Sequence, residues 1–237
     1  MSGGRGGDRV TERRLVVLKC GGAVAKDAAG ATANVIHALA EKNDVVVVHG
    51  AGPQISAEME RRGLEVTFVE GRRITYAAAL EVVRESLAQV NAVLCTAIGP
   101  RAVGLMGDEI GLEAVQVPQF GLVGDPLPSR PMLVLRALDQ ARIPVVAPLA
   151  KGPLNVNADE AAVALAAGLG AERILFVTDV PGLLLDGDVV PSIGADEAER
   201  LLVEGEFRGG IVPKLEAAVR AARLGMRAEI GETAVIA

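Results

Sequence analysis

Short apolar runs alternate along this chain with longer segments in which Ala, Leu and Val recur at helical spacing. Five short runs have the length of buried strands and are rich in Val, Leu and Ile: 15–20, 44–49, 102–106, 143–148 and 173–178. The longer segments predict helices at 29–42, 53–62, 76–96, 132–141, 195–203 and 213–224, with one more ending near residue 169. Strands that alternate with helices form βαβ units, whose parallel strands are covered on both faces. The pattern predicts an α/β fold with a mostly parallel central sheet.

Three stretches interrupt this alternation. Short strands at 65–69 and 72–75 flank a Gly-Arg-Arg turn, and Asp186-Gly187 is a strong hairpin signal. Residues 110–131 are broken by Gly and Pro, so we expect a hairpin and loops there. The end of the chain predicts a final pair of strands.

Composition narrows the class of protein. Half of the 237 residues are apolar, yet Trp is absent and only 2% are aromatic, so Val, Leu, Ile and Ala must build the core. The net charge of −6 gives no basic field to attract nucleic acid. Residues 1–13 are Gly-rich and polar, and we expect a disordered tail.

The same totals bear on the compartment. No signal peptide or membrane span is found, since the longest apolar runs are far below about 20 residues. Both cysteines, Cys20 and Cys95, fall in apolar surroundings and make no disulfide framework. We therefore expect a cytoplasmic protein with reduced thiols and no membrane partner.

The segment Asn155-Val156-Asn157-Ala158-Asp159 concentrates polar groups at the start of an Ala-rich helix. Each Asn or Asp could cap the helix, because its side-chain oxygen accepts the free N–H groups of a first helical turn. Capping explains one polar residue, but not three at alternating positions that share one side of an extended segment. We interpret the segment as a site for a substrate and a phosphate group.

Four further segments carry residues suited to ligands, which in open parallel sheets bind at the carboxyl ends of strands. They are Lys19-Cys20-Gly21-Gly22, His49-Gly50-Ala51-Gly52-Pro53, Thr178-Asp179-Val180-Pro181-Gly182 and Gly209-Gly210-Ile211-Val212-Pro213-Lys214. Such glycines often only make turns. Lys19, however, closes an apolar run, and Lys214 lies at a helix start, where the peptide dipoles disfavour a cation. A bound polyphosphate would explain both lysines, and Asp159 could hold both in place.

Several other classes of site fail on spacing. The chain has no GxxxxGK[ST] loop of a P-loop enzyme, and its first strand–helix turn lacks the GxGxxG of a dehydrogenase. It has two histidines, His37 and His49, and no paired His/Cys cluster, so we predict no metal-ligating residues. No serine lies in a GxSxG elbow.

Six short motifs, in register over about residues 14–230, resemble the amino acid kinase family. They are Lys-Cys-Gly-Gly at 19–22, His-Gly-Ala-Gly-Pro at 49–53, Gly-Arg-Arg-Ile-Thr at 71–75, Asn-Val-Asn-Ala-Asp at 155–159, Thr-Asp-Val-Pro-Gly at 178–182 and Gly-Gly-Ile-Val-Pro-Lys at 209–214. The resemblance implies a three-layer αβα sandwich with two lobes. Residues 14–150 would bind the acyl amino acid and dimerise, and residues 151–237 would bind ATP.

The resemblance further implies an activity and its site. The γ-phosphoryl group of ATP would pass to the side-chain carboxylate of N-acetyl-L-glutamate, a step of arginine biosynthesis. Lys19 and Lys214 would stabilise the moving phosphoryl group, and Asp159 would orient them. A carboxylate acceptor is already ionised at pH 7 and needs no general base, which agrees with the lack of a candidate base.

The remaining site residues are carried over in the same way. The acyl amino acid would be bound by Gly22, Ala51, Gly52, Arg73, Asn155 and Asn157. ATP would be bordered by Gly21, Thr178, Asp179, Val180, Pro181, Gly182, Leu183, Leu184, Phe207, Arg208, Gly209 and Gly210. Mg²⁺ would bridge the phosphates. Ala51 replaces the middle residue of the family's usual Gly-Gly-Gly, a mild change if its backbone angles allow a Cβ.

A homodimer through the helix at 76–96 is also implied. Its narrow apolar seam is formed by Leu80, Val83, Leu87, Val90 and Leu94. The seam could instead pack on the chain's own sheet.

Three other functions stay open at this point. A kinase for aminoadipate on an acidic carrier protein would need a basic entrance, which Arg72-Arg73 alone does not make. A non-catalytic ligand sensor on the same scaffold would not need both lysines and Asp159. A nicotinamide dehydrogenase would bind NAD and ignore ATP.

Overall fold

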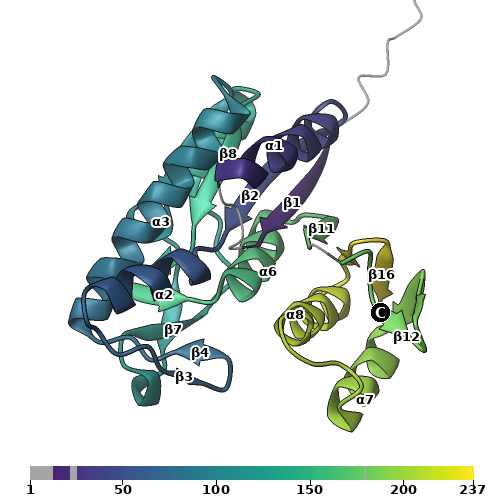
Figure 1. Cartoon of the computed structure of the whole chain (residues 1–237). Helices are drawn as coiled ribbons and strands as arrows, with labels where there is room; N and C mark the ends of the chain where they lie inside the picture. Colours follow the sequence, from purple (N-terminus) through teal and green to yellow (C-terminus); the bar gives the residue numbers. More distant parts are fainter. Residues whose placement is uncertain (1–12, 22–25, 179) are drawn as a thin grey trace, which may run out of the picture.

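One large sheet runs through the whole molecule (Figure 1). The computed structural model describes residues 13–21, 26–178 and 180–237, with the side chains of 26–28 left aside. Its eight-stranded sheet has the order β14-β16-β15-β11-β1-β2-β8-β5. These strands are β1 (Arg14–Cys20), β2 (Asn43–His49), β5 (Ala102–Met106), β8 (Ile143–Ala147), β11 (Arg173–Phe176), β14 (Ser192–Gly194), β15 (Arg227–Ile230) and β16 (Thr233–Ile236). Only β15 and β16 pair antiparallel, so the prediction of a mostly parallel sheet is confirmed.

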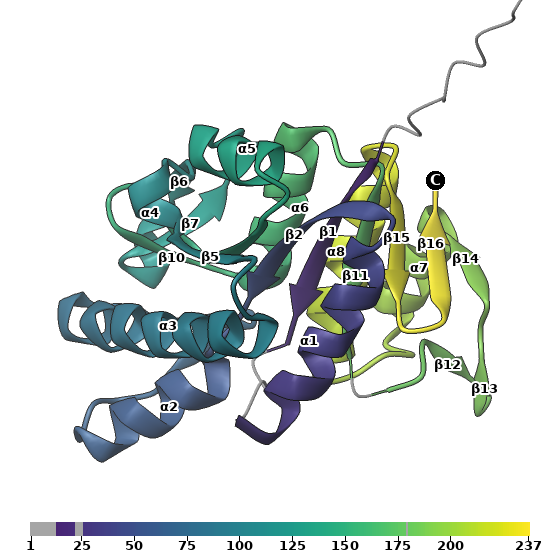
Figure 2. The ribbon, with the colours of Figure 1, turned by 90° about the horizontal axis from the view of Figure 1, so that it is seen from above.

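Helices cover both faces of this sheet (Figure 2). The helices of eight or more residues are α1 (Lys26–Ala40), α2 (Gly52–Arg61), α3 (Ala77–Ile98), α5 (Met132–Asp139), α6 (Ala158–Leu169), α7 (Ala195–Glu204) and α8 (Ile211–Arg223). In Figure 2, α1, α2 and α3 lie on one side and α5 and α6 on the other. The chain therefore has the three layers that the motifs imply.

The strands alternate between two hydrophobic cores because successive side chains of a strand point to opposite faces. Val17 and Val46 pack with α6 and α8, whereas Leu18 and Val47 pack with α1 and α3. Each core is built almost entirely from Val, Leu, Ile and Ala, and Phe176 is a large, fully buried side chain of the core beneath α6 and α8. A chain with few aromatic residues thus still builds two layers of packing.

Smaller sheets form the rim of the molecule. The strands β6 (Ala114–Gln116), β7 (Val123–Pro126), β10 (Leu154–Val156) and β9 (Leu149–Ala150) make a four-stranded sheet, and α4 (Gly107–Ile110) and η1 (Pro118–Phe120) lie nearby in the sequence. Two short hairpins join β3 (Phe68–Val69) to β4 (Arg72–Arg73) and β12 (Leu184–Leu185) to β13 (Asp188–Val189). Both hairpins were expected from turn signals, but the strands at 65–69 and 72–75 are shorter than predicted.

Two further expectations concern the division of the chain. The expected lobe boundary at 150/151 falls between β9 and β10, which pair with each other, and the main sheet includes strands from both sides of that boundary. Residues 1–12 of the expected disordered tail lie outside the described residues. Arg13 is described, and its Nε donates to Asp44 Oδ1 at 2.8 Å.

The apolar seam of α3 is buried inside the chain. Leu80, Val83, Leu87, Val90 and Leu94 are all in the core that α3 shares with α1, α2 and the sheet. Taking the seam as a dimer contact was therefore wrong, because packing on the chain's own sheet accounts for it. The homodimer stays a prediction from the resemblance alone.

No helix within the described ranges combines the length and apolar character needed to cross a membrane.

Candidate active site

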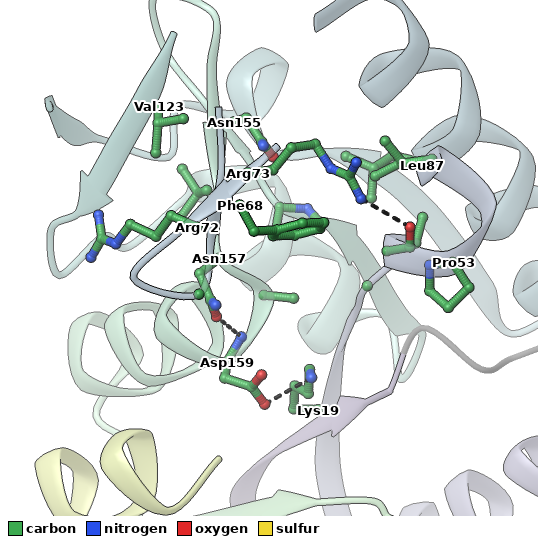
Figure 3. Close-up of a pocket in the computed structure, with 18 residues that line it drawn as sticks. Lys19, Pro53, Phe68, Arg72, Arg73, Leu87, Val123, Asn155, Asn157 and Asp159 are labelled. Atoms are coloured by element: carbon green, nitrogen blue, oxygen red, sulfur yellow. Dashed lines mark hydrogen bonds and ion pairs between the residues drawn. The ribbon is translucent and has the colours of Figure 1, made fainter. Parts of the chain in front are cut away.

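A cavity of about 240 Å³ lies where β1, the β2–α2 turn, the β3–β4 hairpin and the start of α6 meet (Figure 3). We call it the central cavity. Among its lining residues are seven predicted site residues from distant parts of the chain: Lys19, Ala51, Gly52, Arg73, Asn155, Asn157 and Asp159. The topology explains the meeting, because β1 and β2 are adjacent parallel strands whose carboxyl ends share one edge of the sheet.

Lys19 and Asp159 form a buried ion pair at the bottom of this cavity (Figure 3). The Lys19 Nζ lies 2.7 Å from Asp159 Oδ1, and the two side chains are 5% and 8% exposed. Burial lowers the pKa of Lys19, the Asp159 carboxylate opposes that shift, and the positive charge of Lys214 adds to it.

Arg73 is a buried cation that faces the same cavity. Its Nη2 donates to Ser56 Oγ at 2.7 Å and to the Gly52 carbonyl at 3.1 Å. Its guanidinium lies 4.5 Å from the centre of the Phe68 ring, a cation–π distance. Burial lowers its pKa, and within the described residues no carboxylate forms an ion pair with it. A cation held only by neutral groups is suited to bind a carboxylate ligand.

The β3–β4 hairpin sets the position of Arg73. Glu70 and Gly71 both have positive φ, 51° and 73°, as in the two-residue turns that fit twisted hairpins. The turn pairs Phe68 directly with Arg73 across the hairpin, which places the ring beside the guanidinium. Phe68 lines the cavity although it is 54% exposed. Sequence reasoning missed Phe68, but the expected Gly-Arg-Arg turn would have given this register.

The two asparagines of the polar segment serve different ends. Asn155 Nδ2 donates to Thr75 Oγ1 at 3.0 Å, and Thr75 in turn is bound to the hairpin through Arg73 O. Asn157 is the N-cap of α6, since its Oδ1 accepts from the N–H groups of Asp159 at 2.8 Å and Glu160 at 3.2 Å. Capping therefore occupies the Asn157 carbonyl oxygen, as the structural alternative held, although the residue still lines the cavity.

The turn between β2 and α2 accepts Ala51 without strain. Ala51 is the N-cap residue of α2 with φ −143°, a value that any L-residue adopts, so the Cβ is tolerated. Gly52 and Pro53, the first residues of α2, line the cavity, and the N-terminus of a helix favours an anion. His49 supports the turn from below, with Nε2 3.0 Å from Asn91 Nδ2 on α3 and Nδ1 3.4 Å from the Gly50 carbonyl.

A second cavity, of about 410 Å³, lies at the edge of the molecule; we call it the outer cavity. It brings together seven residues of the expected ATP site with Lys214: Thr178, Val180, Gly182, Leu184, Phe207, Arg208 and Gly210. Its walls are largely apolar and exposed, with Val180 at 38% and Leu184 at 46%. Lys214 Nζ donates to the Gly210 carbonyl at 3.3 Å, one turn back along α8.

Some expected site residues lie elsewhere. Leu183 is 0% exposed in the core beneath the outer cavity, because alternation turns it away from Leu184. Gly209 lines a different cavity, and Pro181 contributes its carbonyl to the Glu232 N–H at 2.7 Å. Gly21 follows β1 beside the Val177 carbonyl, and Gly22 and Asp179 lie outside the described residues.

The expected contact of Asp159 with both lysines is wrong for the structure as it stands. Asp159 pairs with Lys19, whereas Lys214 is satisfied by the carbonyl of Gly210. Lys19 lines the central cavity and Lys214 lines the outer cavity, without a carboxylate that both contact.

Comparison with known proteins identifies the family. The Amino acid kinase family matches residues 14–232. An acetylglutamate kinase of Roseiflexus castenholzii is 38% identical over 233 residues, which cover 93% of this chain and 90% of that protein. An acetylglutamate kinase of Rubrobacter xylanophilus is 40% identical over 225 residues, 92% of this chain and 88% of that protein.

Solved structures agree at the level of the fold. The smu.665 protein of Streptococcus mutans superposes with a TM-score of 0.80 at 24% identity, covering 94% of this chain and 98% of that one. Carbamate kinase of Giardia lamblia, bound to AMP-PNP, reaches 0.71 at 15% identity, covering 95% and 99%. With the family match over nearly the whole chain, these comparisons establish that the protein belongs to the amino acid kinase family.

Proposed function

We propose that this protein is an ATP-dependent kinase that phosphorylates the side-chain carboxylate of N-acetyl-L-glutamate. Relatives named acetylglutamate kinase match most of the chain at 38% and 40% identity. The observation that carries the proposal is the central cavity, where the buried Lys19–Asp159 pair and the buried cation Arg73 face one space. One cation can hold a carboxylate while the other meets the phosphoryl group.

The acyl amino acid occupies the central cavity in this proposal. Arg73 binds the α-carboxylate with a bidentate grip, because its fork of N–H donors matches the two carboxylate oxygens. Asn155 presents its amide oxygen to the acetamido N–H, since its Nδ2 is held by Thr75. Ala51, Gly52 and Gly22 contribute backbone N–H groups, and Asn157 contributes its amide nitrogen.

Phosphoryl transfer then needs positioning and charge rather than a base. A side-chain carboxylate oxygen attacks the γ-phosphorus, the bond from that phosphorus to the β,γ-bridging oxygen breaks, and an acyl phosphate and ADP result. Lys19 stabilises the charge on the moving group from the β1 side and Lys214 from the α8 side. Asp159 keeps Lys19 charged and aimed into the cavity.

The nucleotide occupies the outer cavity. Val180, Leu184 and Phe207 offer apolar surface to the base, and the loop before α8 borders the phosphates. The described residues contain no group of three or more His, Cys, Asp or Glu side chains placed to hold a metal. We expect Mg²⁺ to enter with the nucleotide as MgATP, where it would neutralise charge on the phosphates.

Hydroxylamine trapping of the acyl phosphate tests the function. The purified protein is given MgATP and one of four acceptors: N-acetyl-L-glutamate, L-glutamate, L-aspartate or carbamate. We expect hydroxamate and stoichiometric ADP with N-acetyl-L-glutamate far above the others. ADP without hydroxamate, or a different preferred acceptor, would contradict the proposal, and ATP binding with no turnover on any acceptor would favour a sensor.

A further inference from the structure

Arg72 joins three elements that border the central cavity. It lies on β4, and its guanidinium forms an ion pair with Asp125 on β7. Its Nη2 also lies 3.0 and 3.2 Å from the two carboxylate oxygens of Glu160, on the first turn of α6. The contact therefore crosses 88 residues of sequence and ties the hairpin to the helix that carries Asp159.

This bridge is more buried than an ordinary surface ion pair such as the one between Arg200 and Glu197 on α7. The Arg72 and Glu160 side chains are 20% and 17% exposed, whereas those of Arg200 and Glu197 on α7 are 53% and 50% exposed. Burial raises the pKa of Glu160 while Arg72 opposes that rise, so the carboxylate depends on its partner. Partly buried pairs are costly to desolvate and add little net stability, so their worth lies in fixed geometry.

Both partners of the bridge are sequence neighbours of residues in the central cavity. Arg72 precedes Arg73, and Glu160 follows Asp159. Neighbouring strand residues point to opposite faces, so Arg72 turns to α6 while Arg73 turns to Gly52 and Ser56 on α2. The bridge thus connects the hairpin that carries Arg73 to the helix α6 that carries Asp159, the partner of Lys19.

The hairpin needs such an anchor. Its ladder has two residue pairs, Phe68 with Arg73 and Val69 with Arg72, and two-stranded ribbons are marginal by themselves. Phe68 and Val69 are 54% and 42% exposed, so little core packing holds the hairpin in place. Backbone hydrogen bonds of Thr75 with Phe120 and Leu122 hold the end of the hairpin. The side-chain contact of Arg72 with Glu160 is what ties its strand β4 to α6.

We propose that Arg72 and Glu160 are positioning residues that set the separation between Arg73 and the Lys19–Asp159 pair. On the proposed function, this separation selects the length of the substrate, because one end binds Arg73 while the other must reach the phosphoryl group. An acceptor one methylene shorter or longer is then bound at Arg73 but misplaced for transfer. A shift of about 1 Å in such a site lowers turnover by roughly 10²-fold.

The test compares three acceptors in three variants and two controls. N-Acetyl-L-aspartate and N-acetyl-L-2-aminoadipate are one methylene shorter and longer than N-acetyl-L-glutamate. In Arg72→Leu and Glu160→Gln we expect kcat with N-acetyl-L-glutamate to fall by roughly 10-fold to 100-fold. Its preference over the two homologues should fall by about 10-fold, with KM for ATP unchanged. The double variant should be no worse than Arg72→Leu alone, because that substitution already removes the contact with Glu160 as well as the ion pair with Asp125.

Controls separate positioning from general damage. Arg72→Lys keeps the charge and should recover part of the selectivity, and Arg200→Leu, which removes an exposed pair on α7, should change neither rate nor selectivity. Thermal unfolding confirms that each variant is folded; if Arg72→Leu is not, Glu160→Gln, of nearly the same shape, carries the test. Unchanged selectivity in folded Glu160→Gln would overturn the proposal.

A readout independent of activity keeps this inference apart from the proposed function. The Ile74 N–H donates to the Thr67 carbonyl at 3.0 Å and reports on the hairpin. Its hydrogen exchange should accelerate in Arg72→Leu and Glu160→Gln and stay as in the wild type in Arg200→Leu. Equal exchange in all would refute the positioning role even if the enzyme is active, and faster exchange in an inactive enzyme would refute only the function.

Discussion

The central and outer cavities both open near the carboxyl ends of the sheet's strands, but they are held together in opposite ways. In the central cavity the charged side chains are buried and fixed, with Lys19, Asp159 and Arg73 only 4%, 5% and 6% exposed. In the outer cavity the wall is made of short surface segments, the β12–β13 hairpin and the loop before α8, and carries exposed apolar side chains.

The difference shows that the side chains of the central cavity are already ordered before an anion binds. Buried cations held by neutral donors and one carboxylate need no rearrangement when an anion arrives, which is what electrostatic preorganisation requires. Exposed surface segments are held by fewer contacts, and any ordering that a ligand causes there reduces the net affinity. On the proposed function, we therefore expect the fold to set the geometry of the acceptor more tightly than that of the nucleotide.

The largest expected effect contrasts the two lysines. Lys19→Met and Lys214→Met should each lower kcat by about 10²-fold or more, because each removes one donor to the moving phosphoryl group. Only Lys19→Met should also lower the free energy of unfolding, by about 3–5 kcal/mol, because it leaves the Asp159 carboxylate buried and unpaired. Enzyme assays and urea unfolding measure the two quantities.

A double variant serves as the control for that contrast. Lys19→Met with Asp159→Leu removes both charges and should regain most of the lost stability while remaining inactive. If Lys214→Met destabilised the chain as much as Lys19→Met, the distinction between a fixed and an adaptable cavity would fail.

The next effect splits the Michaelis constants. Arg73→Gln should raise KM for N-acetyl-L-glutamate by roughly 10-fold to 100-fold, since charged hydrogen bonds contribute about 1.5–3 kcal/mol, and leave KM for ATP unchanged. Leu184→Ala should do the reverse, raising KM for ATP by less than about 10-fold through lost apolar contact. Steady-state kinetics with each substrate varied in turn measures both KM values. If a variant in one cavity changed KM for the substrate of the other cavity, the two cavities would not be independent.

The last effect concerns pH. Burial lowers the pKa of His49 from 6.5 to about 4, so the unfolded chain takes up its proton first as pH falls. The contribution of His49 to the stability of the fold is fully present above pH 6.5 and should decline between pH 6.5 and about 4, by about 3 kcal/mol in total. Urea unfolding of the wild type and His49→Gln at pH 7.5 and 5 isolates this term, because other titrating groups are common to both. Parallel pH dependence in the two would show that His49 is not buried in neutral form.

Much of the fold and of the central cavity could be predicted from the sequence, for identifiable reasons. Short apolar runs predicted the strands and helical spacing predicted the helices, and Lys19 at the end of an apolar run stood out because a buried cation needs a partner. The rest depends on three-dimensional register. Whether Asn157 caps a helix or faces a ligand, and whether Leu183 faces the core, cannot be decided before the chain direction at each turn is known.

Pattern reasoning also misassigned the α3 seam. A stripe of Leu and Val at heptad-like spacing is the same whether it meets a second copy or the chain's own sheet. Burial of the five seam side chains, with Leu87 at 2% exposure, identifies the chain's own sheet as the partner of this helix. That burial is known only from the structure.

Strand β1 connects the two cavities. It carries Lys19 into the central cavity, and it pairs with β11, which leads to the segment that lines the outer cavity. Because this strand stays in place, protein engineering could replace the exposed segments of the outer cavity without changing the buried central cavity. Grafting the β12–β13 hairpin and the loop before α8 from a relative with another nucleotide preference should alter which nucleotide is consumed, while the choice of acid is inherited unchanged from the host.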